Sequence, residues 1–157
     1  MHDRKIVHRD LKMSKNILLS SSHSDDEIKV KIRDFFNSSL LQAEKFHFDD
    51  MDITTSAPEL LEGNKDIDEK VDVWSVGAIA FILTHQNIPY NMAGNISEEA
   101  TKTEVAEFIR KEELILDSGS AEARDFISKC LAKNSQDRPT VEQLLKHPWI
   151  EEWVKDP

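Results

Sequence analysis

Two short stretches near the N-terminus carry the hydrophobic pattern of β-strands. Residues 16–21 begin with an apolar run, and residues 28–33 alternate isoleucine or valine with lysine or arginine. Such alternation, with a period of two residues, is typical of a strand with one apolar face. The polar run from Ser20 to Glu27 is typical of a turn. The pattern therefore predicts a β-hairpin.

The strongest helix signal lies in the middle of the chain. From Glu69 to about His85, apolar residues occupy nearly every side of the expected helix, which is typical of a helix at the centre of a core. Polar residues that can cap a helix mark where others begin. These helices are expected over residues 97–111 with a capping box at Thr101 and Glu104, over 120–132 from Ser120, and over 140–147 with a capping box at Thr140 and Gln143.

Helices outweigh strands, so the expected fold class is mainly α, or α+β, with one small β-hairpin. Residues 34–57 have no clear period and are rich in serine, threonine and aspartate, which predicts a long loop; loops of that length are usually functional or disordered. The chain has 157 residues, enough for one domain with a single core.

Composition narrows the classes of function. The formal net charge of −10 disfavours a nucleic-acid surface. The longest apolar run, Val76 to Leu83, is far too short to span a membrane. The single cysteine, Cys130, rules out an internal disulfide and fits a reducing compartment, so a cytoplasmic or nuclear location is expected. Cys130 falls within an apolar pattern and is interpreted as a core residue.

Several short motifs follow one another along the chain, and their order and spacing resemble the C-terminal lobe of the protein kinase family. They are Ile6–Lys12 (I-V-H-R-D-L-K), Asp34-Phe35-Phe36, Ala57-Pro58-Glu59, Asp72–Gly77 (D-V-W-S-V-G), Asp137-Arg138-Pro139 and His147–Ile150 (H-P-W-I).

The resemblance covers residues 1–150 and leaves residues 151–157 as a short tail. It is closest to the serine/threonine kinases of the calcium/calmodulin-regulated and calcium-dependent branch. It implies a helical lobe whose β-hairpin carries the catalytic and metal-binding loops. The reaction it implies is transfer of the ATP γ-phosphoryl group to serine or threonine hydroxyls of a protein substrate, with ATP and Mg²⁺ as cofactors.

The resemblance assigns chemical roles to five residues. Asp10 matches the catalytic base that accepts the proton of the substrate hydroxyl, and Lys12 matches the lysine that steadies the γ-phosphate. Asp34 matches the carboxylate that binds magnesium between the phosphates, and Asn16 the second metal ligand. Leu18 matches the residue that packs beneath adenine.

Other matches are architectural. The resemblance places His8 and Phe35 in the stacked hydrophobic spine of the family and makes Asp72 the anchor of the catalytic-loop backbone. It also pairs Glu59 with Arg138, so that the activation segment is joined to the late helices.

Arg9 matches the arginine that clamps a phosphorylated activation loop. The candidate phosphorylation sites are Ser38, Ser39, Thr54 and Thr55, and the loop also carries Asp49, Asp50 and Asp52. A carboxylate can take the place of the phosphate. The alternative interpretation is a solvated acidic loop, and the sequence does not decide between the two.

The chain departs from the family around the expected active site. Five residues separate Asp10 from Asn16, where the family has four, and Met13 stands where a proline is usual. Phe36 replaces the glycine of D-F-G, which predicts a changed direction for Asp34 because glycine tolerates backbone angles that phenylalanine does not. Arg33 precedes Asp34, Met51 and Asp52 align with a Gly-Thr pair, and Thr55 aligns with a tyrosine.

The small N-terminal lobe of the family has no counterpart in the sequence. The four glycines are far apart, so the G-x-G-x-x-G loop that covers the phosphates is absent. Met1 and His2 resemble the end of the helix that precedes the catalytic loop, and one hypothesis is therefore a truncated gene model or a fragment. No phosphotransfer is expected from this chain alone, and an apolar surface is expected where the missing N-lobe would dock.

Three hypotheses follow for the function. The chain is part of a serine/threonine kinase, or a pseudokinase-like binding or scaffold module with a degenerate active site, or a fragment without independent function. A geometric criterion helps to separate the first two. If Asn16 still points into the site with Asp34, the loop has absorbed the extra residue by bulging at residues 13–15; if it points away, the second metal position is lost and the pseudokinase hypothesis gains.

Overall fold

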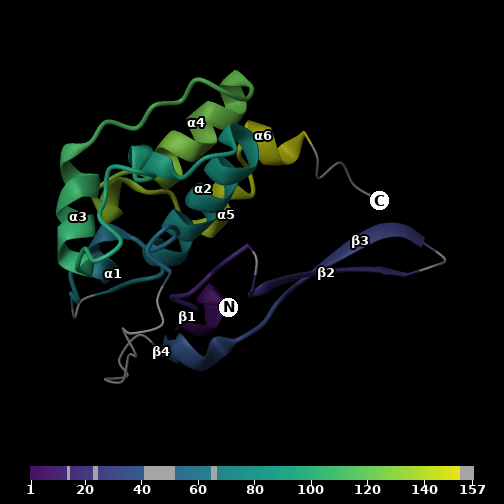
Figure 1. Ribbon diagram of the computed structural model, residues 1–157. Coiled ribbons are helices and arrows are strands. Elements are labelled where there is room, and N and C mark those ends of the chain that lie inside the picture. Colours follow the sequence, from purple (N-terminus) through teal and green to yellow (C-terminus); the bar gives the residue numbers. More distant parts are fainter. Residues whose placement is uncertain (14, 23–24, 41–51, 65–66, 153–157) are drawn as a thin grey trace.

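The computed structural model describes residues 1–13, 15–22, 25–40, 52–64 and 67–152. The helices gather on one side of the molecule and a long hairpin extends from it (Figure 1). The strands are β1 (Ile6–Val7), β2 (Ile17–Ser22), β3 (Asp25–Ile32) and β4 (Ser39–Leu40). The α-helices are α1 (Pro58–Leu61), α2 (Lys70–His85), α3 (Lys102–Lys111), α4 (Ala121–Cys130), α5 (Val141–Leu144) and α6 (Pro148–Glu151). Short 3₁₀ helices cover His2–Arg4, Phe35–Asn37, Pro89–Asn91 and Ser135–Asp137.

The predicted hairpin is confirmed, with β2 antiparallel to β3. The predicted turn was too long. Strand β2 continues to Ser22 and β3 begins at Asp25, because backbone hydrogen bonds extend the ladder through polar residues that give no hydrophobic signal. A second small sheet pairs β1 with β4. It was not predicted, since strands of two residues are too short to show a period.

Helix α2 lies among the other helices, as its apolar sequence predicts (Figure 1). The side chains of Val73, Trp74 and Phe81 are buried. Both predicted capping boxes form, at Thr101 with Glu104 and at Thr140 with Gln143.

Three helices are shorter than expected, and one of them is α4, which ends at Cys130 rather than at residue 132. Helix α3 begins at Lys102, after the cap at Thr101, rather than at residue 97. Helix α5 ends at Leu144, and α6 begins at Pro148. The residue before a proline is driven out of the helical region, and His147 accordingly has an extended backbone and caps α6. Among the described residues, no helix is long and apolar enough to cross a membrane.

Helices α2 and α4 approach each other closely at Gly77. A Cβ atom at this position would lie 2.5 Å from the Cβ atom of Cys130 and 3.3 Å from its carbonyl carbon. Cys130 is fully buried, as predicted, and burial raises the pKa of its thiol to about 12. Glycine at this position therefore sets the distance between the two helices.

We expect Gly77→Ala to lower the free energy of unfolding by about 1–2 kcal/mol, because overpacking outweighs the better helix propensity of alanine. Urea unfolding followed by circular dichroism measures the change. An unchanged or raised midpoint would mean that the helices have room to separate.

Candidate active site

Asp72, the third residue of α2, holds the backbone of the expected catalytic loop. Its carboxylate accepts hydrogen bonds from the backbone N–H of His8 at 2.9 Å and of Arg9 at 2.8 Å. The Nε2 atom of His2 lies 2.8 Å from the same carboxylate. Arg9 has a φ of 67°, a conformation that costs energy for a residue other than glycine. The buried Asp72 carboxylate binds the backbone N–H groups of His8 and Arg9, so it holds the backbone where Arg9 adopts its positive φ.

Two residues of the loop, Lys12 and Asn16, converge on a third, Asp10. The Nζ atom of Lys12 lies 2.9 Å from Oδ1 of Asp10. The side-chain amide of Asn16 donates to the backbone carbonyl of Asp10 at 2.5 Å and lies 3.4 Å from its Oδ2. All three side chains are buried. The Asp10 carboxylate is thus oriented by a cation on one oxygen and an amide on the other.

The extra residue is accommodated in an exposed turn. The backbone N–H of Asn16 donates to the carbonyl of Lys12 at 3.1 Å and closes the turn. Met13 is 43% exposed, whereas Asn16 is 1% exposed. Met13 and Lys15 are thus both exposed, and Asn16 stays against Asp10.

His8 links the catalytic loop to the segment that carries Asp34. Its Nδ1 atom accepts from the backbone N–H of Asp10 at 3.3 Å, so Nε2 carries the proton and donates to the carbonyl of Arg33 at 3.1 Å. The backbone N–H of Arg33 also donates to the carbonyl of Asn16 at 2.9 Å. These contacts place the residue before Asp34 beside the two candidate groups Asp10 and Asn16.

In the segment Asp34-Phe35-Phe36, the strained backbone angles are those of Asp34. Asp34 has φ 66° and ψ 67°, and the following Phe35–Asn37 forms a 3₁₀ helix. Aspartate visits this left-handed region more readily than most residues, and Phe36 itself needs no positive φ. The phenylalanine in place of glycine is therefore compatible with this backbone. Its side chain is largely exposed, while the ring of Phe35 lies 4.8 Å from that of His8.

Leu18 lies on strand β2 of the hairpin. It pairs with Lys31 across the ladder, so the two side chains share one face of the hairpin. Leu18 is partly exposed on that face. The structure thus leaves it accessible to a ligand.

Glu59 and Arg138, which are 79 residues apart, form a two-point ion pair. Nη1 of Arg138 lies 2.5 Å from Oε1 of Glu59, and Nη2 lies 2.9 Å from Oε2. The guanidinium also donates to the carbonyl of Ala132 at 2.8 Å and lies 4.8 Å from the ring centre of Trp74. The Arg138 side chain is fully buried, so the pair joins α1 to the chain beyond α4.

The segment before α1 folds back on itself. Oδ1 of Asp52 accepts from the backbone N–H of Thr54 at 3.0 Å and from its hydroxyl at 2.6 Å. The hydroxyl of Ser75 on α2 donates to the carbonyl of Thr55 at 2.8 Å. Thr55 is buried, which disfavours it as a phosphorylation site. Three residues of the expected acidic or peptide-reading segment lie outside the described residues: Asp49, Asp50 and Met51.

Arg9 is buried. Burial lowers the pKa of its guanidinium, and the nearby Asp72 carboxylate acts in the opposite direction. The phosphate clamp at Arg9 and the solvated acidic loop both stay predictions.

Two supporting residues were missed by the sequence reasoning. His2 reaches Asp72 across 70 positions, and Ser75 reaches Thr55 across 20. Neither lies in a motif that indicates its partner. Only the fold brings these side chains to the loops they hold.

Comparison with known proteins shows the family to which the chain belongs. The family model described as the protein kinase domain matches residues 1–150. The chain belongs to the protein kinase family. It is 33% identical over 157 residues to the calcium/calmodulin-dependent protein kinase cmkB of Emericella nidulans, a match that covers 96% of this chain and 37% of the relative.

Two other relatives show the same range of similarity. The meiosis-specific serine/threonine-protein kinase mek1 of Schizosaccharomyces pombe is 32% identical over 161 residues, with 96% of this chain and 34% of the relative covered. Calcium-dependent protein kinase 5 of Plasmodium falciparum is 32% identical over 164 residues, with 97% and 26% covered. The chain thus spans between 26% and 37% of the length of these three relatives.

Proposed function

We propose that residues 1–150 form the C-terminal lobe of a serine/threonine protein kinase of the calcium/calmodulin-regulated or calcium-dependent branch, followed by a short tail. The observation that carries the proposal is the buried Asp10 carboxylate between the Lys12 ammonium and the Asn16 amide. Phosphoryl transfer depends mostly on positioning and charge stabilisation, and this arrangement holds the carboxylate in one orientation.

Asp10 is the group that orients the serine or threonine hydroxyl of a protein substrate and accepts its proton. The ammonium group of Lys12 lies 2.9 Å from the Asp10 carboxylate, so it is placed beside the hydroxyl to which the phosphoryl group would be transferred. His8 acts as a positioning residue. It fixes the backbone of Asp10 and of Arg33 through opposite nitrogens of one ring.

The residues present fit Mg²⁺. The nitrogen of the Asn16 amide is engaged with Asp10, so its oxygen is the atom left for a cation, and Asp34 supplies an exposed carboxylate. Oxygen ligands suit this hard cation. Bound there with ATP, magnesium would neutralise the phosphate oxygens. Leu18 offers an apolar side chain to the adenine ring.

The pseudokinase-like binding or scaffold module is the second candidate. It is favoured by Asp52, whose carboxylate is engaged with Thr54 at a position where the family has a threonine that helps to shape the peptide site. A module of this kind would bind a protein partner without phosphotransfer.

A chimera separates the two functions. The part of the Emericella nidulans kinase that precedes the matched region is joined to Met1, because phosphotransfer needs groups from both lobes. The chimera is expected to phosphorylate serine or threonine peptides with Mg-ATP, while this chain alone does not. A folded chimera that binds Mg-ATP without turnover would support the scaffold and contradict the kinase.

A further inference from the structure

One face of the β2–β3 hairpin is basic. Leu18 pairs with Lys31 and Ser20 pairs with Lys29 across the ladder, and residues opposite each other share a face. Arg33 lies two positions beyond Lys31, so the alternation of the strand places it on the same face. Lys29, Lys31 and Arg33 are all exposed. In a chain of net charge −10, these cations line the face that carries Leu18.

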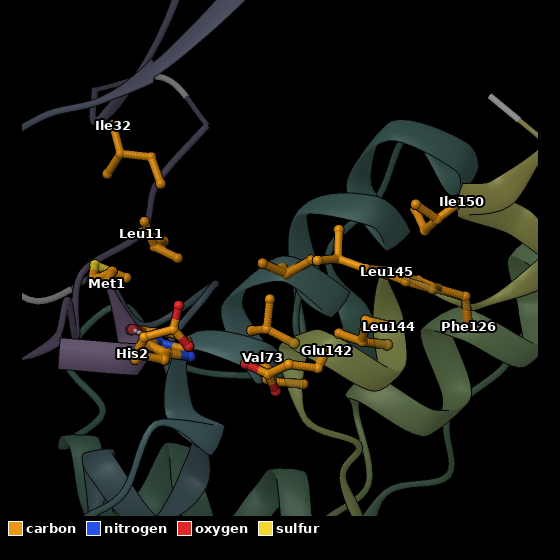
Figure 2. A pocket seen from close by; sticks show the side chains of 14 residues that line it. Met1, His2, Leu11, Ile32, Val73, Phe126, Glu142, Leu144, Leu145 and Ile150 are labelled. Atoms are coloured by element: carbon orange, nitrogen blue, oxygen red, sulfur yellow. Dashed lines mark hydrogen bonds and ion pairs between the residues drawn. The ribbon is translucent and has the colours of Figure 1, made fainter. Parts of the chain in front are cut away.

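The other face of the hairpin has different surroundings, as Ile32 shows. Its side chain lines an apolar pocket, and Figure 2 shows it on the side of the pocket where Leu11 lies. Neighbouring residues of a strand point to opposite faces, so Arg33 is directed away from this pocket. The guanidinium group therefore belongs to the surface around Leu18.

The backbone of Arg33 is held at the candidate metal site. Its N–H donates to the carbonyl of Asn16 at 2.9 Å, and its carbonyl accepts from Nε2 of His8 at 3.1 Å. The next residue along the chain is Asp34. Among the described residues, no carboxylate forms an ion pair with the Arg33 guanidinium. The side chain thus starts from a fixed backbone position, and its charge is available to a ligand.

Arg33 lies near the phosphate end of the proposed nucleotide site. In the proposed kinase, Leu18 contacts the adenine ring, and Asn16 and Asp34 bind the magnesium ion. Arg33 lies opposite Asn16, two residues from the pair of Leu18 with Lys31, which is about 7 Å along a strand. The phosphates that join the two ends of the nucleotide are therefore within reach of Arg33. A guanidinium group can bind two phosphate oxygens at once and stays charged at neutral pH.

We propose that Arg33 is a phosphate-binding residue, through which this chain distinguishes adenosine triphosphate from adenosine. The inference rests on the proposed function for the direction in which the nucleotide lies. Asp10 and Asp34 bring negative charge to the same site, and like charges raise the cost of binding a polyphosphate. The Arg33 guanidinium offsets this repulsion at the phosphates, and Lys31 adds attraction farther along the face.

Removing the charge of Arg33 tests the proposal. Arg33→Met is compared with Arg33→Lys, which keeps the charge, and with Lys111→Met, the matched control for the loss of a cation. Lys111 ends α3, which lies across the helices from the hairpin (Figure 1), and its side chain is 76% exposed. Titration of the isotope-labelled chain with ATP and with adenosine, each with Mg²⁺, gives both dissociation constants from the chemical shifts of the backbone amides.

We expect Arg33→Met to raise the Kd of ATP at least about tenfold, equivalent to about 1.4 kcal/mol, and to leave the Kd of adenosine unchanged. Arg33→Lys is expected to retain most of the affinity for ATP, because the charge remains. Lys111→Met is expected to bind both ligands like the wild type. The amide shifts of the helices report whether each variant keeps its fold.

Unchanged or tighter binding of ATP by Arg33→Met would overturn the inference. An equal loss of affinity for adenosine would also overturn it, because Arg33 would then act on the shape of the site and not on the phosphates. So would a wild-type chain that binds neither ligand. The proposed function is tested separately by phosphotransfer in the chimera. An inactive chimera, with ATP and adenosine still distinguished through Arg33, would contradict the kinase reaction and support the phosphate contact.

Discussion

Replacing Arg138 by methionine is expected to lower the free energy of unfolding by about 3–5 kcal/mol, because removal of one partner leaves a buried charge unpaired. The partner is Glu59, bound at 2.5 and 2.9 Å. Methionine keeps much of the apolar volume beside Trp74 but provides none of the donors for Glu59 or for the carbonyl of Ala132. Chemical denaturation of the two proteins measures the loss.

Arg110→Met is the matched control. Arg110 makes a similar two-point pair with Glu62, at 2.5 and 2.9 Å, but the two side chains are 40% and 24% exposed. Exposed pairs contribute about 0–1 kcal/mol. Equal losses in the two variants would show that burial does not set the cost, and would contradict the role given to Arg138.

Asp10→Asn is expected to reduce kcat of the chimera by about 10²–10⁴-fold, the usual contribution of a positioned acid or base. Asparagine keeps the shape of the side chain but cannot accept the proton of the hydroxyl. Binding of Mg-ATP should change little, because Asn16 and Asp34 supply the proposed metal ligands. Single-turnover kinetics separate the chemical step from nucleotide binding.

Asp117→Asn controls for the loss of one carboxylate. Its side chain is 76% exposed and lies near His85, at the far end of α2 from Asp72, so kcat should be unchanged. Full activity in Asp10→Asn would remove Asp10 from the reaction, and the kinase interpretation of the loop would then fail.

The parts of the fold that the sequence predicts correctly are those with local signals. Capping boxes at Thr101 and Thr140 involve residues three positions apart, and the alternation in β3 repeats every second residue. The pairing of β1 with β4 has no such signal. It joins Val7 to Ser39, and two-residue strands are formed only because the rest of the chain brings them together.

In the candidate site, too, the residues grouped within one short stretch of sequence are predictable, and contacts between distant residues are not. Asp10, Lys12 and Asn16 lie within one short loop, so their grouping is readable from the motif. The support from His2 and Ser75 is not readable, because each reaches a partner that only the tertiary fold brings close. The sequence also does not show whether phenylalanine fits at position 36. That depends on which residue of the segment takes the positive φ, and the residue is Asp34.

We propose that the loop tolerates its extra residue because Met13 and Lys15 are exposed while Asn16 stays on Asp10. Deleting the exposed Lys15 in the chimera restores the usual four-residue spacing between the aspartate and the asparagine. We expect kcat of the deleted chimera, and its dependence on Mg²⁺, to remain within a few-fold of the values for the undeleted chimera. A rise in kcat of about 100-fold or more, equivalent to about 2.7 kcal/mol in the barrier, would show that the insertion disables the site and would contradict the account.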